Sequence, residues 1–216
     1  MRIRTKTLTL TGRFGLSVAL TALTCSPILG LPPGTIEGTL DGLGKGPFVV
    51  YVEQIPGATY PPANPPPIMN QKSKTYLPHV LPVVVGSKVE FHSEDPELHN
   101  VYALALALKS VLFNISIIPG MPPHFYYQAF PQPGVVRLTC NVHKEMLAFI
   151  VVLQNPHFAT LEKGANSFQL ADVPPGKHNL RVWGEKLDEA TLAKRFPVEV
   201  TTGGTAKVSI TQGGRS

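Results

Sequence analysis

The sequence has few charged residues and few long helical patterns. Asp, Glu, Lys and Arg make up 15% of its 216 residues, while Gly and Pro together occupy 41 positions. Short runs of Val, Ile, Phe and Tyr lie between the Gly and Pro clusters, and such runs are typical of strands joined by turns. We therefore predict an all-β protein.

Several catalytic signatures are also missing. The sequence contains no GxSxG nucleophile elbow and no HExxH motif, which argues against the hydrolases built on them. It has no CxxCH haem-attachment motif and no CxxxC pair of the kind found in binuclear copper sites. We therefore do not expect an enzyme.

The first 30 residues have the pattern of a secretory signal. Four basic residues precede the apolar run of residues 14–23, which is too short for a spanning helix. We predict a signal peptide in residues 1–30, export to the periplasm, and no stable membrane insertion after cleavage. An anchor formed by an uncleaved N-terminus, or by a lipid on Cys25, is the alternative.

This segment also explains the high isoelectric point. It contains 4 of the 19 basic residues and none of the 14 acidic ones, so the rest of the chain has a formal charge of +1. The basic balance therefore belongs mostly to the leader, and it gives no reason to expect a nucleic-acid partner.

The chain has only two cysteines, and removal of the leader would leave Cys140 alone. Cysteines of exported proteins usually pair. An unpaired one indicates an intermolecular bridge, a reactive thiol or a metal ligand, and a buried, inert thiol is the plain alternative.

The neighbours of Cys140 favour a metal ligand. Residues 133–140 and residues 147–153 read as two strands, and the loop between them contains His143 and Met146. One tight loop can therefore aim a thiolate, an imidazole and a thioether at a common point. Two His, one Cys and a weakly bound Met define the blue-copper electron-transfer site.

Such a site needs a second histidine from elsewhere in the chain. His99 is the best candidate, because it follows the strand-like residues 87–92 and opens an apolar run. Met121, in a proline-rich stretch, is an alternative axial donor that we interpret as a loop residue near the metal. We interpret the remaining histidines as structural or surface groups: His79, His92, His124, His157 and His178.

On these residues the chain resembles the cupredoxins, and more closely the exported plastocyanin-like proteins often labelled methylamine utilization proteins. The matching pieces include VVYVE (49–53), YLPHVLPVVVGSKVEF (76–91), HNVYA (99–103), PGVVRLTCNVHKEMLAFIVV (133–152) and FQLADVPPGKHNLRVW (168–183). The spacing C-x-x-H-x-x-M is like that of the short amicyanin loop.

The resemblance implies a Greek-key β-sandwich that holds one type 1 copper ion per chain. Carried over residue by residue, the implied ligands are His99, Cys140, His143 and Met146. Asn100 stands where cupredoxins often have an asparagine that ties the two ligand loops together, an outer-sphere link that tunes the metal.

The resemblance also implies two modules. We predict a cupredoxin domain in residues 31–154 and, in residues 155–216, a second β-sandwich similar to carboxypeptidase-regulatory-like modules. The second is small for a free-standing sandwich, so we consider that it shares strands from residues 34–53. Two independent domains on a linker are the alternative.

The implied function is transport of single electrons between redox proteins that dock transiently. We expect an apolar patch around His143 that includes Leu147 and the prolines of residues 121–123. Two alternatives stay open: a periplasmic copper carrier or storage protein, and a copper-free β-sandwich binding module.

Overall fold

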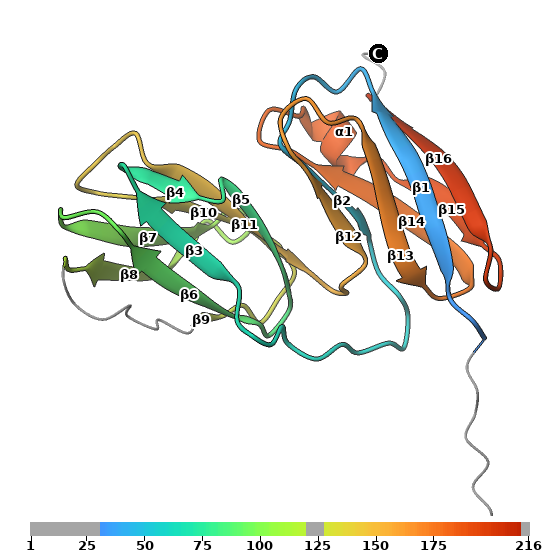
Figure 1. The fold of residues 1–216 in the computed structure, drawn as a ribbon, viewed down its shortest axis with the longest axis horizontal. Helices are drawn as coiled ribbons and strands as arrows, with labels where there is room; N and C mark the ends of the chain where they lie inside the picture. Colours follow the sequence, from blue (N-terminus) through green and yellow to red (C-terminus); the bar gives the residue numbers. More distant parts are fainter. Residues whose placement is uncertain (1–30, 120–127, 213–216) are drawn as a thin grey trace, which may run out of the picture. The chain divides into compact units, whose positions relative to one another are not determined.

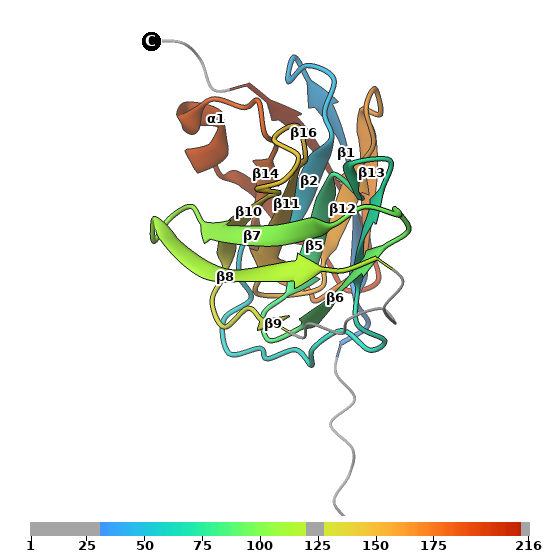
Figure 2. The same ribbon diagram turned by 90° about the vertical axis from the view of Figure 1, so that its left-hand side faces the viewer.

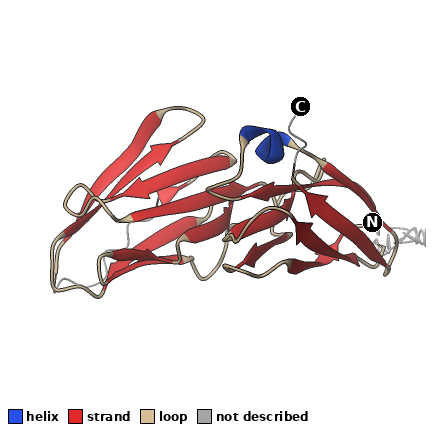
Figure 3. Cartoon of the chain, turned by 90° about the horizontal axis from the view of Figure 1, so that it is seen from above, coloured by secondary structure: helices blue, strands red, loops and turns tan. Residues whose placement is uncertain are grey.

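The structure is a computed structural model that describes residues 31–119 and 128–212. The predicted signal peptide, Met121 and His124 lie outside these residues. Almost every element is a strand (Figures 1 and 3), and the helix α1 (Glu189–Ala193) is short. The prediction of an all-β protein is therefore confirmed. No helix in the described ranges is long and apolar enough to cross a membrane.

Residues 68–153 contain two sheets. The first has five strands in the order β5 (Val80–Val84), β11 (Leu147–Leu153), β10 (Gly134–Thr139), β7 (His99–Ala105) and β8 (Ser110–Ile117). The second has the order β4 (Thr75–Leu77), β3 (Ile68–Lys72), β6 (Lys88–Ser93) and β9 (Gln128–Ala129). Strands β7 and β8 form an antiparallel hairpin at one edge of the five-stranded sheet (Figure 2).

One buried cluster packs between these two sheets. It joins Phe91 of the four-stranded sheet to alternate residues of β7, such as Val101 and Ala103. This alternation follows from the two-residue period of a strand. Cys140 and Met146 belong to the same cluster, so the predicted sulfur ligands lie in the core of this sandwich.

Two further sheets form a second sandwich. One has the order β13 (Ser167–Val173), β1 (Gly34–Asp41) and β16 (Thr205–Thr211). The other has the order β12 (Phe158–Leu161), β2 (Phe48–Val52), β14 (Gly176–Trp183) and β15 (Phe196–Val200). A separate buried cluster fills this sandwich.

The two N-terminal strands belong to the sheets of the second sandwich. β1 pairs with β13 and β16, and β2 pairs with β12 and β14. Among the described residues, neither strand pairs with a strand of residues 68–153. The sheets of the first sandwich therefore come from residues 68–153 alone. The expected domain boundaries, 31–154 and 155–216, and the independence of the two domains stay predictions.

A third buried cluster has members from both sandwiches. Val49 and Trp183 come from β2 and β14, and the other members come from β5 and β11. The rings of Phe149 and Trp183 meet with their centroids 5.1 Å apart. Six of the seven residues of β11 are consequently buried, which accounts for its unbroken apolar run LAFIVVL.

Gly38 offers a direct test of packing in the second sandwich. A Cβ at this position would overlap the ring of Phe168 and lie 2.6 Å from the carbonyl oxygen of Val208. We expect Gly38→Ala to lower the free energy of unfolding by about 1–3 kcal/mol, because neither backbone nor ring can move freely. Urea unfolding measures the change, with Ser167→Ala on the exposed face of β13 as control. Equal stability of the two variants would contradict this packing.

His157 should make stability depend on pH. Its Nε2 lies 3.3 Å from the Tyr60 hydroxyl, its Nδ1 lies 3.4 Å from the Ala171 carbonyl oxygen, and burial lowers its pKa. A lowered pKa means that the unfolded chain binds the proton more readily. The stabilisation from neutral His157 is then complete above the unfolded pKa of about 6.5 and is lost as pH falls through the folded pKa.

We therefore expect the urea midpoint of the wild type to fall more steeply between about pH 7.5 and pH 5 than that of His157→Gln. Parallel pH profiles of the urea midpoint for the two proteins would show that His157 does not contribute to the pH dependence of stability.

Candidate metal centre

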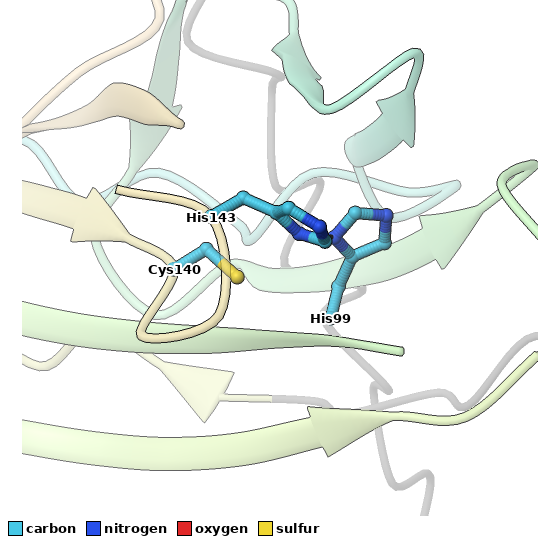
Figure 4. A group of neighbouring side chains, drawn as sticks. All are labelled: His99, Cys140 and His143. Atoms are coloured by element: carbon cyan, nitrogen blue, oxygen red, sulfur yellow. Dashed lines mark hydrogen bonds between the residues drawn. The ribbon is translucent and has the colours of Figure 1, made fainter. Parts of the chain in front are cut away.

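The structure brings three of the predicted ligands together. The ligand atoms of His99, Cys140 and His143 all lie within 4.8 Å of one another. Figure 4 shows the two imidazole rings meeting while the Cys140 sulfur points toward the same space. His99 begins β7, Cys140 directly follows β10, and His143 lies in the loop before β11. Within residues 31–119 and 128–212, no other group of three or more His, Cys, Asp or Glu residues has this geometry.

The pairing of β7 with β10 brings His99 and Cys140 to the same end of the sheet. β7 and β10 pair antiparallel, and their ladder ends at the pair Tyr102–Thr139. Beyond that pair the backbone ladder ends, and hydrogen bonds that involve the Cys140 and Asn100 side chains link the two segments instead. Both side chains are nearly or fully buried, with exposed fractions of 0% for His99 and 3% for Cys140.

Asn100 connects the two ligand-bearing segments. Its side-chain oxygen accepts a hydrogen bond from the Asn141 N–H at 2.6 Å, and its backbone N–H points at the Cys140 Sγ at 3.5 Å. The side-chain amide donates to Asn114 at 2.7 Å, which fixes its orientation. The hydrogen bond between Asn100 and Asn141 is the kind of link that the resemblance to cupredoxins implies. Its effect on a bound metal stays a prediction.

The two histidines face each other through equivalent nitrogens. The Nδ1 atoms of His99 and His143 lie 3.1 Å apart. The Nε2 of His99 lies 2.8 Å from a carboxylate oxygen of Asp95, and the Nε2 of His143 lies 3.0 Å from a carboxylate oxygen of Glu97. A carboxylate only accepts hydrogen bonds, so each contact places a proton on Nε2.

Both Nδ1 atoms then present lone pairs to each other in a largely buried space. Two acceptors at this distance repel each other unless a cation, either a shared proton or a metal ion, lies between or beside them. Donor atoms bound to one ion at about 2.0–2.3 Å lie no more than roughly twice that distance apart. The spread of the three ligand atoms, within 4.8 Å, slightly exceeds this limit, so binding of one ion by all three requires a small shift of at least one side chain.

The donor set discriminates among metals. A thiolate with two imidazoles is a soft ligand set that favours copper over hard cations such as calcium or magnesium. Met146 is 1% exposed and lies in the same buried cluster as Cys140. Its N–H donates to the His143 carbonyl oxygen at 3.1 Å and closes a turn in the loop. Its part as axial ligand stays a prediction.

The two carboxylates next to the histidines were not identified from the sequence. Burial alone would raise the pKa of Asp95, but hydrogen bonds from the N–H groups of Lys74 and Ser73 hold that pKa below its ordinary value. A side-chain hydrogen bond from Lys74 lowers the pKa of Glu97. The signal in the sequence is DPELH, which places acidic residues four and two positions before His99.

The other described histidines lie apart from this group. The Nε2 of His92 lies 3.0 Å from Glu90. His79 bridges the Leu147 carbonyl oxygen at 3.0 Å and the Glu185 carboxylate at 2.9 Å. His157 and His178 are buried in the second sandwich. These contacts agree with a structural interpretation of all four.

Comparisons with known proteins identify structural neighbours but no family. No protein-family model matches the chain, and no curated protein matches it either. The solved structure of a reduced amicyanin variant is similar over 48% of this chain and 97% of its own, with 20% identity and a TM-score of 0.36. A purple cupredoxin from Nitrosopumilus maritimus is similar over 39% of this chain and 95% of its own, with 23% identity and a TM-score of 0.32.

The Asp95 contact generates a prediction about metal affinity. Asp95→Asn removes the charged acceptor that orients His99, and loss of such outer partners typically weakens metal binding about 10–100-fold. Competition titration of Cu(II) against a chelator measures the change. Glu90→Gln is the matched control, because Glu90 contacts His92 outside the group. Equal affinities of the two variants would show that Asp95 does not orient the ligand.

Proposed function

We propose that this protein is an exported type 1 copper protein that carries single electrons between redox partners. The observation that supports this most is the convergence of one buried thiol and two imidazoles, with their ligand atoms within 4.8 Å of one another. His99, Cys140 and His143 would form the trigonal plane, and Met146 would supply the weak axial contact. A copper ion held there supplies the Cu(II)/Cu(I) couple.

The frame around the site suits electron transfer. The β10–β11 and β7–β10 ladders hold the strands from which His99 and Cys140 emerge, and the buried Asn100 ties the ends together. Close-packed cores deform little. Ligands fixed in this way change position little between oxidation states, which keeps the reorganisation energy of each transfer low.

The surface beside His143 suits brief docking. The His143 side chain is 15% exposed, and Leu98 and Val142, which neighbour ligands in the sequence, are 48% and 50% exposed. Leu147, which we expected in this patch, is half-buried, and residues 121–123 lie outside the described ranges. Exposed apolar side chains next to two of the ligands in the sequence would suit a transient redox encounter, since such complexes bury little area.

A copper titration of the purified protein tests the proposal. We expect an intense visible thiolate-to-copper charge-transfer band that saturates at one copper per chain. The band should be absent in Cys140→Ser and present in the control His92→Gln, whose histidine lies outside the group. Tight binding without the band would overturn electron transfer in favour of a copper carrier. Absence of stoichiometric binding would leave a β-sandwich interaction module with a buried thiol.

A further inference from the structure

The hydroxyl of Tyr76 reaches both strand ends that carry the buried candidate ligands. Tyr76 lies in β4, on the sheet opposite β7 and β10, and its side chain is fully buried. The hydroxyl lies 2.7 Å from the Asn100 carbonyl oxygen and 3.1 Å from the Thr139 carbonyl oxygen. Asn100 directly follows His99, and Thr139 directly precedes Cys140.

This contact lies where the β7–β10 ladder ends. The last pair in register is Tyr102–Thr139, so the backbones of Asn100 and Cys140 no longer bond directly to each other across the sheet. Buried carbonyl groups need a donor. The single O–H of Tyr76 is shared between the two carbonyl oxygens and therefore acts as a clamp across the gap between the strand ends.

A second observation shows that this corner of the core is more polar than packing requires. Gln71 is paired with Tyr76 across β3 and β4 and is 0% exposed. Neither atom of its side-chain amide has a partner in good hydrogen-bond geometry, although the amide is near enough to the Tyr76 hydroxyl to act on the pKa of that group. A buried polar group without a well-formed hydrogen bond destabilises the folded chain. A leucine at residue 71 would fill this space without that cost, so stability alone does not explain the buried amide of Gln71.

We propose that Tyr76 is a positioning residue for the metal centre: by clamping the carbonyl groups of Asn100 and Thr139, it sets the separation of His99 from Cys140. This inference rests on the proposed copper function. Loss of the hydroxyl leaves the ring in the core but releases the two carbonyl groups. The strand ends then move, and the thiolate and the imidazole no longer meet the ion in the same geometry.

The test compares Tyr76→Phe with Tyr102→Phe, which removes a hydroxyl from half-buried Tyr102 in β7 without touching the clamp. We expect Tyr76→Phe to weaken Cu(II) binding by about 10-fold or more and to shift both the charge-transfer band and the reduction potential. Tyr102→Phe should match the wild type in all three. A Tyr76→Phe protein with unchanged affinity, band and potential would overturn the inference, whatever its stability.

A measurement without copper separates this inference from the proposed function. In the metal-free protein, Tyr76→Phe should speed hydrogen exchange at the Asn141 N–H, which the Asn100 side chain protects, while Tyr102→Phe should not. Equal exchange in all three proteins would overturn the clamp. A wild type that forms no charge-transfer band would instead overturn the copper function.

If Tyr76→Phe does not fold, 3-fluorotyrosine at residue 76 keeps the side-chain volume and changes only the strength of the O–H donor. A shifted band and potential support the clamp, and unchanged values contradict it.

Discussion

The hydrogen-bonded ladder between β7 and β10 is the constraint on which the candidate site depends. It holds Val136 to Thr139 in register with Ala105 to Tyr102 and then stops. His99 and Cys140, which are far apart in the sequence, therefore emerge from neighbouring strands at the same end of one sheet. A shift of this register by one residue would turn one of the two side chains to the opposite face.

The rest of the first sandwich maintains this end of the sheet. Asn100 bonds across to Asn141 from within the five-stranded sheet, and Tyr76 bonds to the same region from the opposite sheet. Asp95 and Glu97 bind the outer nitrogens of the two imidazoles. A cation relieves the repulsion between the two Nδ1 atoms. The soft set of one thiolate and two imidazoles favours copper over hard cations.

Local sequence patterns predict two strands of the first sandwich and part of the candidate site. The strands 133–140 and 147–153 correspond to β10 and β11, because turn residues bound two short apolar runs. The loop motif and the upstream histidine also indicate that His99, Cys140 and His143 come together, while Met146 as a ligand stays a prediction.

Other features depend on tertiary contacts that no local pattern specifies. The sequence predicts strands near residues 34–53 but does not identify β13, β16, β12 and β14 as their partners. The apolar run after His99 gives no indication that the chain turns between β7 and β8, where Leu108 is 63% exposed. No local sequence pattern predicts the role of Tyr76, because its hydroxyl lies beside Asn100 only once the two sheets pack together.

In the proposed function, a thiolate and two imidazoles bind one copper ion. X-ray absorption at the copper edge of the loaded protein tests it most directly. We expect one short copper–sulfur contact and two copper–nitrogen contacts from imidazole in the oxidised protein, with little change on reduction. A copper ion surrounded only by nitrogen and oxygen, with no sulfur neighbour, would contradict it.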